Sequence, residues 1–465
     1  MKSIAKRTGI SLVLACILLF GVLTFTIRYF LYADRWVSFT GSPHVYTDGR
    51  LDTGEIVDRS GEVLYSASAD LCYSDSASLR KATLHLIGDA AGNIPPRILR
   101  AYASKLFGYD KLNGTAAMEN SGGELKLTVS AQVQAVAMQA MNGRKGAVGV
   151  YNYKTGEILC AISSPSFDPL DPPDLETENE DGYYDGVYIY RFFHASYTPG
   201  SIFKLTTLAA ALDAVPGLTE ETFTCTGERI INGEKITCPR AHGELTLREA
   251  LAKSCNCSFA EIALRTGKNV MTGQAEAERL TENLIIDGIT TVRGNFDLSD
   301  ASDNDLAWAG IGQYTDLVNP CQYMVFMGAI AGGGSAAEPC LVSSAQCGGR
   351  VTYEAVAGQT PRMLSVSAAK TLREYMRYNV TQMYDAVDIP GVEVCAKSGT
   401  AEVGTDANTA TFAGFIADEE YPLAFIVIVE EGGAGSAVAA PVARSVLEAC
   451  INVLDGEREG RMQNA

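Results

Sequence analysis

The feature that most constrains this chain is an uncharged apolar run close to its N-terminus. Gly9 to Ile27 is a stretch of 19 residues without a charged side chain. A helix of that length spans roughly 30 Å, the thickness of the hydrocarbon core of a bilayer. Basic residues precede the run and an aromatic cluster, Tyr29 to Trp36, follows it. Because basic residues favour the cytoplasmic side and aromatic rings the interface, we expect a cytoplasmic end at 1–8, a transmembrane anchor at 9–32 and the remainder outside the cytoplasmic membrane.

A cleaved signal peptide is the alternative interpretation of this run. Signal peptides have a shorter apolar core that ends in a small-x-small cleavage site, and no such site closes this run. The segment Val13-Leu14-Ala15-Cys16 resembles a lipoprotein cleavage box, but few apolar residues precede it. An uncleaved anchor explains the run better than either alternative.

The remaining composition is that of a globular protein. The chain has 465 residues, 47% of them hydrophobic and 20% charged, which allows more than one domain with a sizeable core. The formal net charge is −18. A nucleic-acid partner would require a basic surface, so we expect none.

The 12 cysteines do not form a recognisable framework. None forms a C-x-x-C pair, so we expect no structural zinc site, and they are too few for a disulfide scaffold. Cys225 and Cys238 differ from the others because they flank Asn232-Gly233, a strong hairpin turn signal. We predict that a hairpin brings these two thiols close together, and whether they are oxidised stays open.

The hydrophobic pattern after residue 145 predicts strands at both ends of a largely helical region. Strands are expected at 146–153, 157–163, 392–398, 409–416 and 423–431. Helices are expected at 199–212, 247–265, 323–330, 366–377 and 439–454. This order predicts an α+β fold in which one antiparallel five-stranded sheet is packed by helices.

Ser201 and Lys204 form the first candidate catalytic pair. Pro199 and Gly200 allow the backbone to turn before the serine, which then lies at a helix N-terminus, where free N–H groups favour developing negative charge. Lys204 lies three residues later, on the same helical face. Under apolar neighbours its amine could be neutral enough to accept the serine proton. The plainer alternative is an N-capping serine beside a solvent-facing lysine.

A second motif, Lys397-Ser398-Gly399-Thr400, ends an apolar strand. The lysine supplies positive charge, and the two hydroxyls could hold a carboxylate. Gly399 would let a substrate approach the strand edge closely. The alternative is a strand that simply enters a turn.

Ser254 and Asn256 form the third candidate motif. Each of the three motifs has at least one further match elsewhere in the chain. Ser254-Cys255-Asn256 interrupts a helical pattern with residues that favour caps and turns, so we expect a helix–turn–helix that points both polar side chains into a cleft. The other matches are Ser3/Lys6, Ser367/Lys370, Ser302/Asn304 and Lys154/Gly156. Ser302 lies in a dense acidic stretch, which is an awkward setting for an anionic substrate, and we therefore prefer Ser254.

The three motifs together resemble the signature of penicillin-binding proteins and active-site-serine β-lactamases. They occur in family order, and their flanks resemble those of penicillin-binding transpeptidases. The resemblance covers residues 125–455 and extends more weakly to Gly54–Gly61, which is similar to the membrane-proximal motif of the monofunctional, high-molecular-weight class. It implies a pedestal domain at 33–125, a serine β-lactamase/transpeptidase-like domain at 126–455 and a polar tail at 456–465. The flanking segments that carry it are Thr155–Ile158, Ser164–Pro169, Tyr197–Lys204, Gly312-Gln313, Asn319-Pro320 and Ala396–Glu402.

The resemblance also implies a mechanism. Ser201 would attack the carbonyl between the terminal D-alanines of a peptidoglycan stem peptide, with Lys204 as the base. Ser254 would relay a proton to the leaving group, and Asn256 would orient Lys204. Lys397 would set the local potential, Ser398 and Thr400 would hold the terminal carboxylate, and the backbone N–H groups of Ser201 and Thr400 would form the oxyanion hole. No cofactor or metal is required, and the four histidines suit no Ser-His-Asp triad.

The resemblance therefore indicates a peptidoglycan D,D-transpeptidase that β-lactams inhibit covalently. A D,D-carboxypeptidase, in which water replaces the acceptor amine, is the nearest alternative. A penicillin-sensing protein or an inactive scaffold is the alternative outside enzymes, and no β-lactamase-like deacylation glutamate motif is present. The short segments before the catalytic region leave no room for a glycan-polymerising domain, so we expect a separate glycan polymerase as a partner.

Overall fold

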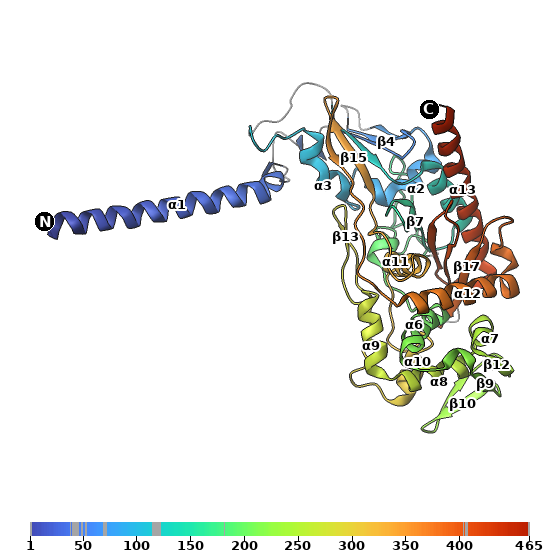
Figure 1. Cartoon of the computed structure of the whole chain (residues 1–465). Coiled ribbons are helices and arrows are strands. Elements are labelled where there is room, and N and C mark those ends of the chain that lie inside the picture. The colour runs from blue at the N-terminus through green and yellow to red at the C-terminus, as the bar shows by residue number, and fades with distance from the viewer. Residues whose placement is uncertain are drawn as a thin grey trace.

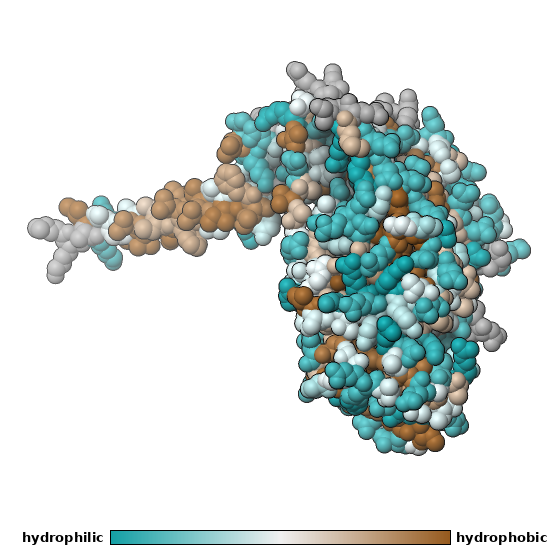
Figure 2. All heavy atoms as spheres, turned by 45° about the vertical axis from the view of Figure 1, so that its right-hand side comes forward, coloured by the Kyte–Doolittle hydropathy of each residue, from teal (hydrophilic) through white to brown (hydrophobic). Residues whose placement is uncertain are grey.

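An isolated N-terminal helix precedes the folded body. The computed structural model describes residues 2–37, 39, 46–47, 50–51, 54–67, 72–113, 122–180, 182–402, 404 and 408–463. Helix α1 (Lys2–Val37) projects away from the rest of the molecule in Figure 1. An 18-residue window within its segment Lys6–Ala33 has a mean hydropathy of 2.7 and no buried residue, and the helix presents a largely apolar surface in Figure 2. This helix is a candidate membrane span.

The core of the body is the five-stranded antiparallel sheet that the sequence predicts. Its strand order is β17-β18-β19-β7-β8, with every neighbouring pair antiparallel. All residues of β18 and β19 are buried, because helices cover both faces of the sheet. The strands are β7 (Gly146–Asn152), β8 (Ile158–Ser164), β17 (Val394–Ala401), β18 (Thr409–Ile416) and β19 (Leu423–Val429).

Two layers of helices enclose this sheet. Helix α11 (Pro320–Ala331) packs against β7, β18 and β19, while α13 (Gly435–Gln463) packs against β17, β18, β19 and helix α4 (Ala131–Met141). Helix α13 is also long and apolar enough to span a membrane, but 44% of its apolar window is buried inside the protein, so it is a core helix. It continues through most of the expected polar tail, to Gln463.

A helical region lies beyond one end of the sheet (Figure 1). The expected helix over 247–265 is two helices, α7 and α8, with a break at residues 253–255. The predicted hairpin is present, with Asn232 and Gly233 at positive φ in its turn. The helices are α6 (Lys204–Ala214), α7 (Leu247–Ala252), α8 (Asn256–Thr266), α9 (Lys268–Ala277), α10 (Asp303–Ala309) and α12 (Val366–Met383), and the strands are β9 (Thr222–Cys225), β10 (Glu228–Ile231), β11 (Glu234–Thr237) and β12 (Gly243–Thr246).

A second sheet, of six strands, lies on the side of the anchor helix. Its order is β16-β15-β6-β3-β4-β5, so it combines strands from residues 55–127 with a hairpin from residues 342–354. Helices α2 (Ala77–Ile87) and α3 (Arg97–Leu106) accompany it. The strands are β3 (Glu55–Val57), β4 (Val63–Ser66), β5 (Cys72–Tyr73), β6 (Glu124–Leu127), β15 (Val342–Cys347) and β16 (Arg350–Glu354). The domain limits 33–125 and 126–455 stay a prediction, and part of the first range lies outside the described residues.

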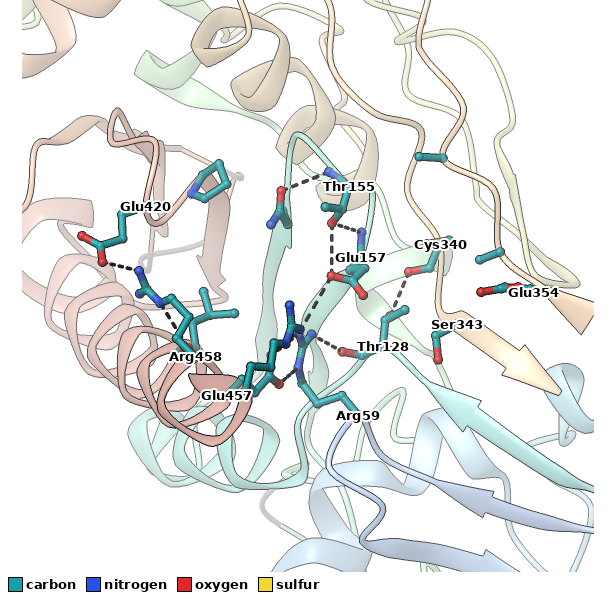
Figure 3. A pocket seen from close by; sticks show the side chains of 16 residues that line it. Arg59, Thr128, Thr155, Glu157, Cys340, Ser343, Glu354, Glu420, Glu457 and Arg458 are labelled. Carbon is teal, nitrogen blue, oxygen red and sulfur yellow. Dashed lines mark hydrogen bonds and ion pairs between the residues drawn. The ribbon is translucent and has the colours of Figure 1, made fainter. Parts of the chain in front are cut away.

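Arg59 connects this second sheet to the catalytic region. Its guanidinium donates to the Glu457 carboxylate at 2.5 Å and to the Thr128 carbonyl at 2.9 Å. Figure 3 shows these contacts in a pocket of about 540 Å³ between the two parts. The neighbouring Asp58 accepts the backbone N–H of Ala131 at the start of α4. The segment Gly54–Gly61 therefore holds the two sheets together.

Candidate active site

Ser201 lies in a tight turn beside the end of strand β17. It belongs to a short 3₁₀ helix, η1 (Gly200–Phe203), which leads into α6. Gly200 has a φ of +58°, and a Cβ there would lie 2.5 Å from the Thr400 carbonyl oxygen, so only glycine fits. The turn thus places the half-buried Ser201 next to the Lys397–Thr400 segment.

Lys204 is fully buried and lies at the centre of the site. Its Nζ is 2.9 Å from Ser201 Oγ, 2.7 Å from Asn256 Oδ1 and 3.1 Å from Ser254 Oγ, and it also donates to the Ser254 carbonyl at 2.9 Å. Burial, together with the nearby Lys397 ammonium, holds the pKa of Lys204 well below its usual value. A neutral amine in this position can accept the proton of Ser201.

Ser254 and Asn256 reach Lys204 from the junction of α7 and α8, where the sequence predicted a helix–turn–helix. Ser254 has a φ of +53°, an uncommon conformation for a residue with a side chain and one that clusters at functional sites. Its Oγ is also 3.2 Å from Lys397 Nζ. Asn256 Nδ2 donates to the Thr237 carbonyl at 2.8 Å, which fixes the direction of its Oδ1 toward Lys204.

The other matches to the three patterns have plain structural uses. Ser302 caps helix α10 in a capping box with Asp305. Lys370 is exposed on α12, and Lys154 lies in the exposed turn between β7 and β8. Ser3 and Lys6 lie on α1. The structure brings together the predicted set and none of these residues.

The Lys397–Thr400 segment forms the end of β17. Lys397 is fully buried, and burial lowers the pKa of its ammonium to about 7. Its Nζ donates to the Ser398 carbonyl at 2.6 Å. Thr400 Oγ1 accepts the Gly435 N–H at 3.4 Å. The first contact lies within β17, and the second ties the strand end to the start of α13.

Gly399 also has a packing role that the sequence did not indicate. A Cβ on Gly399 would lie 2.2 Å from Thr411 Oγ1 and 2.8 Å from the Pro199 carbonyl oxygen. The glycine therefore allows β17 to pack closely against the segment that carries Ser201, rather than only leaving space for a substrate.

Two features of the site were not predicted as functional. Tyr384 Oη is 2.9 Å from Ser398 Oγ and accepts the Ser398 N–H at 3.3 Å. A tyrosine just after a helix gives no signal in the sequence. Gly312 has a φ of +79°, and its carbonyl accepts the Gly200 N–H at 3.0 Å. The sequence marked Gly312-Gln313 as a flanking motif. It did not indicate that Gly312 supports η1.

A cluster of cysteines and a histidine lies directly behind Ser254 and Asn256. The ligand atoms of Cys225, Cys238, His242 and Cys255 all lie within 4.8 Å of one another. The predicted closeness of Cys225 and Cys238 is thus confirmed, and both thiols are free. Among the residues that the structure describes, this is the group able to hold a metal ion.

Known proteins match this chain over a range that includes the whole of this site. A family model described as "Penicillin binding protein transpeptidase domain" matches residues 146–448. The peptidoglycan D,D-transpeptidase PbpA of Mycolicibacterium smegmatis is 32% identical over 387 residues, which are 76% of this chain and 78% of that protein.

Solved structures agree with this match. The penicillin G acyl-enzyme complex of penicillin-binding protein A from M. tuberculosis superimposes with a TM-score of 0.72 at 26% identity, covering 86% of this chain and 99% of that chain. The D,D-transpeptidase domain of a peptidoglycan glycosyltransferase from Eggerthella lenta gives a TM-score of 0.75 at 26% identity, covering 86% and 98%. All three candidate motifs lie inside the matched range.

Proposed function

This chain belongs to the penicillin-binding protein transpeptidase family, and we propose that Ser201 is the nucleophile of its acyl-transfer reaction. The protein is a serine-type peptidoglycan D,D-transpeptidase. The observation that carries the assignment of Ser201 is the 2.9 Å contact between its Oγ and the buried Lys204 Nζ. A nucleophile and a base within hydrogen-bond reach, with the base oriented by a third group, form the arrangement that activates a hydroxyl. Asn256 supplies that third group.

The reaction then proceeds in two acyl transfers. Ser201 Oγ attacks the carbonyl between the two terminal D-alanines while its proton passes to Lys204 Nζ. The C–N bond breaks, and the leaving D-alanine nitrogen takes a proton through Ser254 Oγ, which lies between the two lysines. An ester on Ser201 remains. The amine of a neighbouring stem peptide attacks this ester, loses a proton to the site and releases Ser201 with its hydroxyl restored.

The end of β17 is suited to hold the terminal carboxylate of the donor peptide. Lys397 provides positive charge next to Ser398, and Ser398 and Thr400 provide hydroxyl groups. Tyr384 fixes the Ser398 side chain through its Oη. Gly200 and Gly399 bring the backbones of η1 and β17 together, which supports an oxyanion hole formed by the N–H groups of Ser201 and Thr400. One such donor contributes roughly 10²–10³ in rate.

Attachment to the cytoplasmic membrane and a polymerase partner complete the proposal. Helix α1 would cross the membrane with its basic N-terminal end in the cytoplasm, and the second sheet would act as a pedestal. Cross-linking needs newly made glycan strands, so the proposal includes a glycan polymerase that supplies them.

A labelled penicillin tests the assignment of the nucleophile. We expect the label to map to the peptide that contains Ser201 and to disappear in Ser201→Ala, while Ser302→Ala is labelled like the unchanged protein. Label on another residue, or undiminished labelling of Ser201→Ala, excludes Ser201. Digestion of peptidoglycan made with the purified protein distinguishes the activities: dimeric muropeptides indicate transpeptidation, and shortened monomers alone indicate a carboxypeptidase.

A further inference from the structure

We infer that Cys225, Cys238, His242 and Cys255 form a zinc site directly behind the active-site residues Ser254 and Asn256. The four ligand atoms lie within 4.8 Å of one another. Within this cluster Cys225 Sγ lies 3.5 Å from His242 Nδ1, and Cys238 Sγ lies 3.8 Å from Cys255 Sγ. With Zn–S bonds of about 2.3 Å, the sulfurs of a tetrahedral site are separated by about 3.8 Å. The cluster therefore already has nearly the size of a tetrahedral Cys₃His site.

Three separate chain segments supply these ligands. Cys225 ends β9, Cys238 follows β11, and His242 precedes β12, whose Gly243 pairs with Cys225. Cys255 comes from the break between α7 and α8. The ligands are spread over the chain without a C-x-x-C pair, which is why the cysteine spacing gave no reason to expect zinc.

Two of the sulfurs also accept hydrogen bonds. Cys238 Sγ accepts the backbone N–H groups of Asn256 at 3.1 Å and Cys257 at 3.4 Å, at the N-terminus of α8. Cys255 Sγ accepts the Ser258 hydroxyl at 3.1 Å. Donors of this kind, and the positive end of a helix, stabilise thiolates and orient metal ligands. Binding of Zn²⁺ would release three thiol protons to solvent and leave a site of net charge −1.

A bound metal ion would stabilise the part of the fold around the cluster. Strands β9–β12 (residues 222–246, here the hairpin lobe) form two two-stranded sheets beyond the main sheet (Figure 1). A two-stranded sheet is marginally stable by itself. The few fully enclosed apolar side chains of this lobe include Phe223, Ile236 and Leu245. A metal that joins β9, β11 and α8 would anchor the lobe.

Residues next to the zinc ligands in the chain contact the proposed catalytic lysine, Lys204. Cys255 lies between Ser254 and Asn256, both of which contact Lys204 Nζ. Thr237, next to Cys238, accepts the side-chain N–H of Asn256 at 2.8 Å. We therefore assign the metal a positioning role for Ser254 and Asn256. That role rests on the proposed function, whereas metal binding itself does not.

Metal content of the full-length protein in detergent tests the site. Protein purified under reducing conditions should hold about one Zn²⁺ per chain after incubation with Zn²⁺ and dialysis. Replacement by Co²⁺ should give the thiolate-to-metal charge-transfer absorption of a tetrahedral thiolate site. Cys238→Ser and His242→Ala should lose most of the bound metal. Cys257→Ser is the matched control, because Cys257 Sγ is 3.6 Å from Cys238 Sγ but is not one of the four ligands, and it should keep the metal.

Labelling with penicillin separates this inference from the proposed function. Removal of zinc should slow acylation at least several-fold without moving the label from Ser201. His242 is half-buried and forms no described hydrogen bond with Lys204 or Lys397, so His242→Ala remains informative even if the cysteine variants fail to fold. Metal content below about a tenth of an equivalent in the reduced protein, or equal metal content in His242→Ala, would overturn the site. A disulfide between Cys238 and Cys255 or Cys257 in protein prepared without reductant would also overturn the site, if the same protein fails to bind Zn²⁺ after the disulfide is reduced.

Discussion

Ser254 Oγ lies 3.2 Å from Lys397 Nζ, although 143 positions separate the two residues in the chain. The same oxygen is 3.1 Å from Lys204 Nζ. One hydroxyl therefore connects the two buried amines of the site, and no other described serine hydroxyl is hydrogen-bonded to both lysines. This arrangement gives Ser254 the geometry of a proton relay between the base and the leaving group.

Replacement of Ser254 by alanine should slow acylation by penicillin roughly 10²-fold or more, because the relay is lost. Stopped-flow or gel-based labelling measures the rate. The matched control is Ser302→Ala, which should leave the acylation rate unchanged and cost about 1 kcal/mol of stability through loss of the cap on α10. A slow Ser302 variant beside a normal Ser254 variant would show that the wrong motif had been chosen.

Lys204→Ala should reduce the acylation rate by roughly 10²–10⁴, the usual contribution of a positioned general base. The comparison variant is Lys370→Ala, since Lys370 completes a second Ser-x-x-Lys pattern but is exposed on α12. Lys370→Ala should behave like the unchanged enzyme. A loss of less than threefold in Lys204→Ala would remove Lys204 from the role of base.

Much of this site could be predicted because its signals are local. Pro199-Gly200 before Ser201, and the polar break in a helical pattern at Ser254, each indicate a backbone conformation by themselves. The five strands of the main sheet were predicted because strands buried on both faces give continuous apolar runs. The choice between Ser254 and Ser302 was possible because a dense acidic stretch is an awkward setting for an anionic substrate.

The contacts that the sequence did not reveal depend on long-range packing. Tyr384 reaches Ser398 only because α12 ends beside β17, and no local pattern marks such a meeting. The hairpin at 342–354 joins the sheet of residues 55–127, a pairing across more than two hundred positions. The four-residue cluster around Cys238 likewise exists only after β9, β11 and α8 have come together.

Tyr384→Phe should weaken acylation several-fold while the protein remains folded. The change removes the oxygen that contacts the side chain and the N–H of Ser398, and a typical hydrogen bond contributes about 0.5–1.5 kcal/mol. Tyr375→Phe on α12 serves as the control for loss of a tyrosine hydroxyl in this region. Equal acylation rates in the two variants would show that Tyr384 does not position Ser398.

The orientation of the anchor can be tested in spheroplasts. Protease added from outside should release a soluble fragment that still binds labelled penicillin, because the proposed orientation puts the folded body, which follows α1, on the outer side. A cytoplasmic marker protein must remain intact in the same sample, and detergent-lysed cells provide the control for protease activity. Protection of the penicillin-binding domain in sealed spheroplasts would place it in the cytoplasm.

The two lysines of the site should titrate as an interacting pair. Lys397 and Lys204 are both fully buried, and burial lowers the pKa of each ammonium. The charge of Lys397 lowers the pKa of Lys204 further. The active form should therefore have a neutral Lys204, which accepts the serine proton, and a charged Lys397, which attracts the substrate carboxylate.

The rate of acylation should consequently rise with pH as Lys204 loses its proton and fall again near pH 7, where Lys397 becomes neutral because burial lowers its pKa to about 7. The measurement is the second-order rate of penicillin acylation across this range. Lys397→Arg separates the two limbs, since a guanidinium stays charged throughout. The ascending limb should remain and the descending limb should disappear or move to much higher pH, whatever the absolute rate. A descending limb that stays near pH 7 in Lys397→Arg would show that another group controls it.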